Sequence, residues 1–313
     1  MRTMLLAALL LQIPGVLSGP DPAQMEKAAD LGYAPVAFAL ALPNGMKLGA
    51  PSSVAFNSAA HMFVFNRGAS PLIEFDQSGA FVRVLGEGRY TRPHGMRIDR
   101  QDNIWTTDVA GHTVTKMSPK GEVLLTLGVK GQAGTWDEAA NTRLLNEPTD
   151  IAFAANGDVL IVEGHGRGEG RVLAFDKSGK FLRSWGGNGK GPGQFDQPHS
   201  IAVDGKGMIY VADRENRRVQ VFDGAGKYQK EWKFAGLPCG LFVNRDGQLF
   251  LTSGFAGQIL RLDSNGKALA ATGQPGKGLG EFGEAHYMAI APNDDIYVAD
   301  TVNAALHKFV KKH

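Results

Sequence analysis

The sequence is poor in cysteine, in helical patterning and in net charge. Cys239 is the only cysteine, so no intramolecular disulfide can form and stability must come from packing. Helical periodicity is almost absent after residue 35, which favours an all-β fold. The 33 basic and 31 acidic residues are spread along the chain without a basic block or interleaved aromatics, so nucleic acid is not an expected partner.

Glycine is abundant, at 41 of 313 residues, and often lies between short apolar stretches. Pairs such as Gly179-Lys180 and Asp246-Gly247 stand where a hairpin turn needs a positive φ. The sequence therefore predicts many short antiparallel strands joined by tight turns.

An internal repeat organises these strands. Six segments start alike: Pro51-Ser-Ser-Val, Pro93-His-Gly-Met, Pro148-Thr-Asp-Ile, Pro198-His-Ser-Ile, Pro238-Cys-Gly-Leu and Ala285-His-Tyr-Met. Their starts are 42, 55, 50, 40 and 47 residues apart, the period expected for four short strands. A unit that cannot bury both of its faces must stack on its neighbours, so we predict a six-bladed β-propeller forming a single domain over residues 36–313.

The amino-terminal segment resembles an export signal. One positive charge and an apolar run precede the small residues Ser18 and Gly19, so residues 1–19 are interpreted as a signal peptide, with an uncleaved anchor as the alternative. Residues 20–35 form a polar extension. The sixth repeat lacks an outer strand, and we predict that residues 36–42 supply it and close the ring. A secreted or periplasmic location follows.

Three histidines occupy one phase of the repeat, in alternate copies only. The second residues of the six segments form a ring around one mouth of the expected channel: Ser52, His94, Thr149, His199, Cys239 and His286. Neutral imidazoles suit zinc, and three of them with one open position are typical of a catalytic site; copper or iron would also accept nitrogen ligands. The alternative is that each histidine is a turn residue bonded to backbone.

Two arginines follow the second strands of opposite blades. Arg67 and Arg214 are suited to binding a carboxylate, or else pair with neighbouring acids such as Glu215. The acids of the same ring, Asp108, Asp213 and Asp300, are interpreted as structural. His165 follows the second strand of blade 3 at this mouth and is either a base or an ordinary loop residue.

These residues resemble NHL-repeat propellers and, among them, peptidyl-α-hydroxyglycine α-amidating lyase, also called peptidylamidoglycolate lyase. The similarity covers about Ser53 to Phe309, with its sharpest pieces in Arg67-Gly68, Pro93-His94-Gly95, Pro198-His199-Ser200 and Ala212-Asp-Arg-Glu-Asn216. The resemblance implies zinc on His94, His199 and His286, active-site roles for Arg67 and Arg214, and cleavage of the C–N bond of a C-terminal α-hydroxyglycine to an amide and glyoxylate.

The chain departs from that family at three points. The family's active-site tyrosine corresponds to the stretch containing His165, so either His165 replaces it or the proton-transfer group is missing. The aspartate associated with the family's structural calcium is Tyr287 here, so calcium is not expected. The family's disulfides cannot form.

The leading hypothesis is an exported zinc lyase, active as a monomer on a small-molecule or peptide substrate with a terminal carboxylate. No membrane partner is expected beyond the signal peptide. The alternatives are a non-catalytic NHL module that binds a protein or peptide, and a propeller hydrolase of the lactonase kind. The latter would place carboxylates and an asparagine on calcium.

Overall fold

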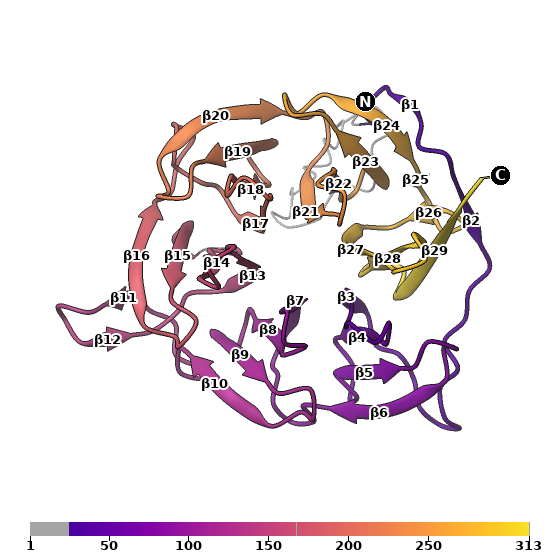
Figure 1. The fold of residues 1–313 in the computed structure, drawn as a ribbon, viewed down its shortest axis with the longest axis horizontal. Helices are drawn as coiled ribbons and strands as arrows, with labels where there is room; N and C mark the ends of the chain where they lie inside the picture. The colour runs from indigo at the N-terminus through magenta and orange to yellow at the C-terminus, as the bar shows by residue number, and fades with distance from the viewer. Residues whose placement is uncertain (1–24, 167, 313) are drawn as a thin grey trace, which may run out of the picture.

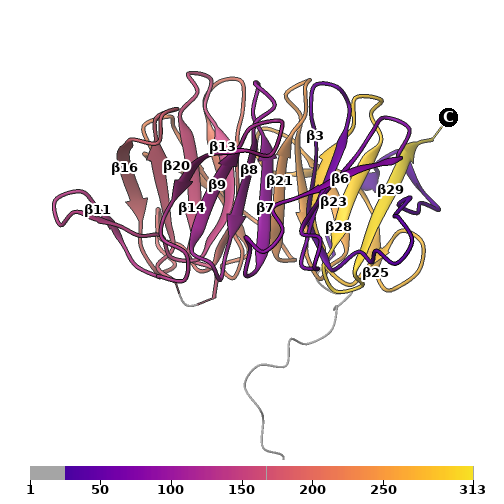
Figure 2. The same cartoon turned by 90° about the horizontal axis from the view of Figure 1, so that it is seen from below.

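The computed structural model describes residues 25–166 and 168–312, so the predicted signal peptide lies outside the described residues. The described chain forms six blades arranged as a ring around a central axis (Figure 1), and the ring is wider than it is tall when seen from the side (Figure 2). The predicted all-β propeller is confirmed.

Each blade is an antiparallel sheet whose first strand lies innermost. Blades 1 to 3 consist of β3 (Pro51–Phe56), β4 (Met62–Asn66), β5 (Leu72–Phe75) and β6 (Phe81–Leu85); β7 (Pro93–Ile98), β8 (Ile104–Asp108), β9 (Thr113–Met117) and β10 (Val123–Leu127); and β13 (Pro148–Phe153), β14 (Val159–Glu163), β15 (Arg171–Phe175) and β16 (Phe181–Gly186).

Blades 4 to 6 follow the same order. They consist of β17 (Pro198–Val203), β18 (Ile209–Asp213), β19 (Arg218–Phe222) and β20 (Tyr228–Lys233); β21 (Pro238–Val243), β22 (Leu249–Ser253), β23 (Gln258–Leu262) and β24 (Ala268–Thr272); and β27 (Ala285–Ile290), β28 (Ile296–Asp300), β29 (Ala305–Lys311) and β2 (Tyr33–Val36). Short pairs β11 (Trp136–Asp137) with β12 (Thr142–Arg143), and β25 (Gln274–Pro275) with β26 (Glu281–Phe282), lie in the linkers.

A strand from the amino-terminal part of the chain closes the ring, as predicted, but its residues differ from the predicted ones. The outer strand of blade 6 is β2, Tyr33–Val36, antiparallel to β29, and not residues 36–42. Phe38, Leu40 and Leu42 instead pack their side chains on the apolar cluster between blades 6 and 1. The predicted extension therefore enters the ring at Tyr33, and β1 (Ala29–Asp30) adds a short parallel edge to β24 of blade 5.

The apolar core lies between the blades. Each of six buried clusters among the described residues joins two neighbouring blades, for example Trp105 and Leu173 between blades 2 and 3. Burying these faces removes apolar surface from water, which stabilises the whole ring without disulfides. Among residues 25–166 and 168–312 there is no helix of the length and apolar character that crossing a membrane requires.

Candidate metal centre

A β-bulge at the start of every inner strand builds one mouth of the channel. In each blade the pairing register between the first and second strands shifts directly after the first residue of the inner strand. A bulge re-aims the side chain of the extra residue. The six residues at this position, which we call the axial ring, are buried with at most 1% exposure: Ser52, His94, Thr149, His199, Cys239 and His286.

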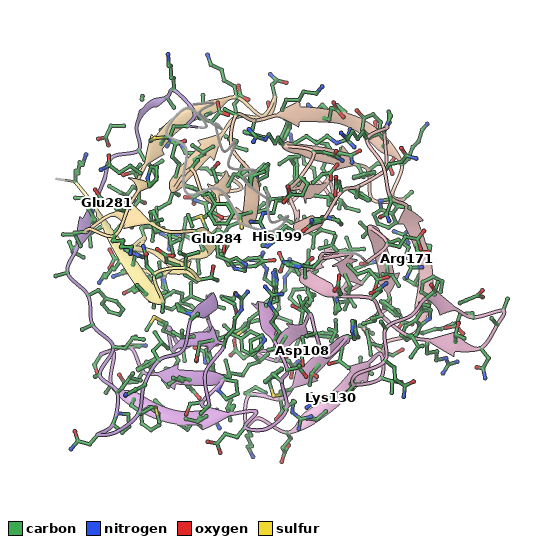
Figure 3. All side chains as sticks on the ribbon, turned by 180° about the vertical axis from the view of Figure 1, so that it is seen from behind. Asp108, Lys130, Arg171, His199, Glu281 and Glu284 are labelled. Carbon is green, nitrogen blue, oxygen red and sulfur yellow. The ribbon has the colours of Figure 1, made fainter. Side chains whose placement is uncertain are left out.

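The three predicted histidine ligands of this ring come together. Ring centroids are 4.6 Å apart for His94 and His199, 4.8 Å for His94 and His286, and 4.8 Å for His199 and His286. They reach the axis from alternate blades, 2, 4 and 6. Figure 3 shows His199 near the middle of the ring, with Glu284 beside it.

Each of these imidazoles is oriented by a backbone carbonyl of the following blade. Nδ1 of His94 lies 2.9 Å from the Thr149 oxygen, Nδ1 of His199 lies 3.0 Å from the Cys239 oxygen, and Nδ1 of His286 lies 2.7 Å from the Ser52 oxygen. A carbonyl only accepts, so each Nδ1 carries the proton and donates it, which leaves a lone pair on each Nε2. Nε2 of His94 is buried without a hydrogen-bond partner among the described residues.

Burial keeps the three imidazoles neutral. It holds the pKa of His94 and of His199 well below the usual value, with neighbouring imidazoles adding to the effect. Burial likewise lowers the pKa of His286 to about 4, partly offset by Glu284. Neutral imidazole is the form that binds a metal, so these ligands need not lose a proton at neutral pH.

The donor set fits a divalent transition metal. Three neutral nitrogens converge in a buried site, their second nitrogens are fixed by carbonyls, and the Nε2 of His94 lacks any other partner. This combination matches the ligand chemistry and outer hydrogen bonds of zinc sites with an open position.

His165 joins the same cluster from the loop that follows β14. Its ring lies 5.0 Å from that of His94 and 5.7 Å from that of His199. The donor atoms of these three histidines all lie within 4.8 Å of one another. Burial, followed by Arg214 and Arg92, lowers the pKa of His165 to about 3. His165 is therefore half-buried next to two of the proposed ligands, and its role as a base stays a prediction.

Cys239 belongs to the axial ring, and its thiol forms a second group of possible metal ligands with His199 and His286, whose donor atoms all lie within 4.8 Å of one another. Its Sγ lies 3.6 Å from Nδ1 of His199 and 3.9 Å from Nε2. The thiol packs beside the His199 ring, and burial raises its pKa, which keeps it protonated.

The two predicted arginines lie at the histidine mouth but have different partners. Pro51 pairs with Asn66 and Pro198 with Asp213, so Arg67 and Arg214 follow directly on opposite blades. Arg214 forms a buried ion pair with Glu284, with 2.9 Å between Nη2 and Oε1. Nε of Arg67 donates to the Pro93 oxygen at 3.2 Å, and this guanidinium forms no ion pair with the described residues.

Among the described residues Arg67 therefore forms no ion pair, although the charge of Glu284 acts on it. Burial lowers the pKa of Arg67, the nearby Arg92 lowers it further, and Glu284 raises it in part. Arg92 is exposed, and it precedes Pro93, whose oxygen Arg67 binds. An anionic ligand beside Arg67 would be attracted by both guanidiniums.

The acids at the ends of the second strands hold the blade linkers, as interpreted from the sequence. Asp108 accepts from the Thr91 and Arg92 amides at 2.7 Å each, and Asp213 accepts from the Asp196 amide at 2.7 Å. Asp300 accepts from the Gly283 and Glu284 amides. Each bond anchors the segment that leads into an inner strand.

Sequence reasoning missed Glu284, Arg92 and the bulges. Glu284 and Arg92 stand two residues before His286 and His94, and this spacing is a signal that a comparison of repeats offers. The sequence gives no comparable signal for the bulges, because a bulge is defined by the register between two paired strands.

These observations define a six-bladed propeller with a three-histidine centre at one mouth. The model of a family described as a 6-bladed beta-propeller matches residues 140–256. Human NHL repeat-containing protein 3 is 34% identical over 171 residues, covering 51% of this chain and 48% of the relative. Peptidyl-alpha-hydroxyglycine alpha-amidating lyase 1 of Drosophila melanogaster is 26% identical over 325 residues, covering 86% of this chain and 58% of the relative.

The chain thus has relatives among NHL repeat-containing proteins and among amidating lyases, and it spans about half the length of these two curated relatives. Among solved structures, a streptogramin B lyase superposes with a TM-score of 0.63 at 15% identity, over 91% of this chain and 99% of that one. The superposition supports the propeller fold.

Proposed function

We propose that this protein is a zinc-dependent carbon–nitrogen lyase that cleaves a peptidyl-α-hydroxyglycine or a related carbinolamide carboxylate into an amide and glyoxylate. One observation carries the proposal. Three neutral imidazoles from alternate blades converge with Nε2 lone pairs available, beside an arginine that forms no ion pair with any residue the structure describes. Relatives that bear the name of this activity support it.

His94, His199 and His286 are the proposed ligands. When bound, zinc would supply a Lewis acid that lowers the pKa of a hydroxyl at the open position. The imidazole set is preferred by zinc, and copper or iron would accept it too.

Arg67 is the proposed carboxylate-binding residue. Its guanidinium is half-buried, retains its charge and has only a carbonyl as a partner, so a bidentate contact with a substrate carboxylate costs no existing ion pair. Arg214 is proposed to act through its charge. Its contact with Glu284 holds it near His286, where its guanidinium contributes positive potential and is not free to bind a carboxylate.

His165 is the proposed proton carrier. Its neutral imidazole can take the proton of the substrate hydroxyl and deliver it to the leaving amide nitrogen as the C–N bond breaks and the carbonyl of glyoxylate forms. A carboxylate bound beside Arg67 offsets part of the positive potential that depresses the pKa of His165. Substrate binding would thus bring His165 closer to the range of a useful base.

We propose export to the periplasm or outside the cell, a monomer as the active form, and a small-molecule or peptide substrate as the partner. The axis offers imidazoles where a lactonase of the calcium type would offer carboxylates, and the buried acids Asp150 and Glu284 are held by arginines.

The test measures metal content and glyoxylate release in the same samples. Wild-type protein is compared with a His94→Ala/His199→Ala variant and with His61→Ala, a control at a half-buried histidine that contacts Glu74 in blade 1. One zinc per chain in the wild type and control only, with glyoxylate formed from an α-hydroxyhippurate only by these two, supports the lyase. Zinc without glyoxylate rejects this substrate class, and a wild type without metal leaves a binding propeller.

A further inference from the structure

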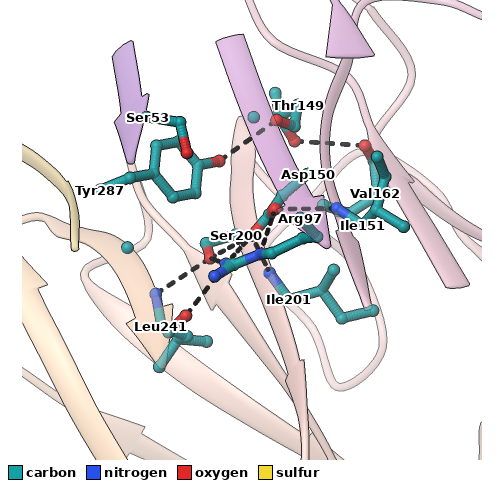
Figure 4. Close-up of polar contacts among 12 residues, drawn as sticks. Ser53, Arg97, Thr149, Asp150, Ile151, Val162, Ser200, Ile201, Leu241 and Tyr287 are labelled. Carbon is teal, nitrogen blue, oxygen red and sulfur yellow. Dashed lines mark hydrogen bonds and ion pairs between the residues drawn. The ribbon is translucent and has the colours of Figure 1, made fainter. Parts of the chain in front are cut away.

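Two side chains close the channel directly beneath the three imidazoles. Tyr287 comes from β27, one residue after His286, and Arg97 comes from β7, three residues after His94. Figure 4 shows the tyrosine ring and the guanidinium among the inner strands, each with hydrogen bonds into the surrounding blades. The Arg97 carbon Cζ lies 5.5 Å from the centre of the Tyr287 ring.

Tyr287 contacts every proposed metal ligand. Its ring centroid lies 4.7 Å from that of His286, 5.6 Å from that of His199 and 5.7 Å from that of His94. Its hydroxyl lies 2.5 Å from the His199 oxygen and 3.2 Å from the Thr149 oxygen. The Thr149 oxygen is also the acceptor for Nδ1 of His94, so one hydroxyl reaches the backbone that orients two ligands.

Arg97 forms hydrogen bonds with residues of the inner strands next to Tyr287. Its Nε and Nη2 donate to the two oxygens of Asp150 at 2.9 and 2.6 Å, and Nη2 also donates to the Leu241 oxygen at 3.0 Å. Ser200 donates to Asp150 at 2.6 Å and accepts from the Leu241 amide at 2.9 Å. These contacts connect blades 2 to 5, and Tyr287 adds blade 6.

The structural calcium implied by the family resemblance does not fit this layer. Calcium takes six to eight oxygen ligands, including carboxylates and carbonyls. Here the His199 and Leu241 carbonyls point at a hydroxyl and a guanidinium, and both oxygens of Asp150 are held by Arg97. The position of the expected aspartate carries Tyr287, which is buried.

We propose that Arg97 and Tyr287 act as a built-in replacement for an axial cation, and that they are positioning residues for the three-histidine centre. The guanidinium supplies the positive charge that Asp150 requires and a donor for the Leu241 carbonyl, and the tyrosine hydroxyl donates to the His199 carbonyl. The positioning role rests on the metal site proposed above, whereas the replacement role does not.

Removing one hydroxyl isolates the positioning role. Tyr287→Phe leaves the ring beneath the imidazoles but leaves the His199 oxygen without the hydroxyl, so the strands that carry His199 and Thr149 lose a shared anchor. Loss of an outer-shell contact typically lowers metal affinity about 10- to 100-fold, and we expect a drop at the low end of that range. Tyr210→Phe is the matched control, because it removes a hydroxyl bond of 2.8 Å to Asp204 away from the axis.

The first measurement is the zinc affinity of each variant, by competition with a chromogenic chelator. The second is the Tm of unfolding of each variant, in the presence of calcium and in the presence of EGTA. The wild type is expected to show the same Tm in both solutions, and the lower zinc affinity is expected for Tyr287→Phe but not for the Tyr210→Phe control. Arg97→Met leaves Asp150 without its cation, so this variant is expected to gain a rise in Tm with calcium but not with magnesium.

Three outcomes overturn the proposal. A wild-type Tm that rises with calcium shows that the layer still needs an ion. Unchanged zinc affinity in Tyr287→Phe removes the positioning role, and an Arg97→Met variant that folds without responding to calcium removes the replacement role. If the wild type binds no zinc, the proposed function fails, and the calcium measurements still decide on the replacement of the ion.

Discussion

Position in the repeat decides what a histidine of this chain does. His94, His199 and His286 follow the first residue of an inner strand, and each donates through Nδ1 to the next blade. His61, away from the axis, instead lies 2.7 Å from the Glu74 carboxylate. The same imidazole is a ligand candidate in the first setting and a hydrogen-bond partner of a carboxylate in the second.

Substitution of the two arginines at the mouth is expected to have different effects, on substrate binding for Arg67 and on stability for Arg214. Arg67→Gln is expected to raise the KM for a carboxylate substrate about 10- to 100-fold, as loss of a charged hydrogen bond of about 1.5–3 kcal/mol implies, with little change in Tm. Arg214→Gln is expected to lower Tm, because Glu284 would remain buried without its cation. Steady-state kinetics and thermal melts separate the two, with the exposed Arg89→Gln as the control. Equal effects of both variants on KM would contradict this division.

At the scale of the strand, the bulge directs the second residue of each inner strand to the mouth of the channel, where the candidate site lies. A regular inner strand would send alternate side chains to its two faces, whereas the bulge frees the second residue to point along the channel mouth. Gly95 sits inside the bulge of β7, where a Cβ would lie 2.4 Å from the Thr149 oxygen.

Gly95→Ala is therefore expected to push β7 away from β13. Overpacking of this kind costs about 1–3 kcal/mol, so Tm should fall by several degrees, and zinc affinity should fall because His94 is the neighbouring residue. The matched control is Gly205→Ala, at a turn where an added Cβ meets nothing within 4 Å. Calorimetry and chelator competition measure both effects, and a variant that loses neither stability nor zinc would show that the bulge tolerates a side chain.

The sequence predicted the elements better than their ends. Repeat spacing was sufficient for six blades, because each blade must bury its faces on neighbours, and the alternation of histidines placed three ligands at one mouth. The closing strand begins three residues and ends six residues before the predicted one: Val36 was expected to begin it and instead ends it, because the apolar side chains that follow pack on a cluster rather than pair. The Arg214–Glu284 and Arg97–Asp150 pairs join distant blades, and a single chain carries no signal of such pairings.

At the scale of the whole molecule, the proposed metal would connect blades 2, 4 and 6, none of which is the neighbour of another in the ring. A ligand bound only by the folded state, at about 1,000 times its Kd, adds about 4 kcal/mol to the free energy of unfolding.

Zinc is therefore expected to raise the Tm of the wild type by several degrees, and a chelator is expected to reverse the rise. The His94→Ala/His199→Ala variant should show neither change, although its blades remain intact. Differential scanning calorimetry with and without the metal makes the comparison. A shift of equal size in the variant would place the metal elsewhere.

The alternation of the axial ring has a consequence for the ancestry of the fold. Rotation by one blade exchanges a histidine for a small residue, whereas rotation by two blades returns a histidine, so the chemistry has threefold symmetry within a sixfold shell. The smallest unit that regenerates the centre is a pair of blades. A gene fragment encoding one pair, repeated three times, would have contained the imidazole, the bulge and the carbonyl that orients it. The site could thus have arisen together with the ring instead of being added to it.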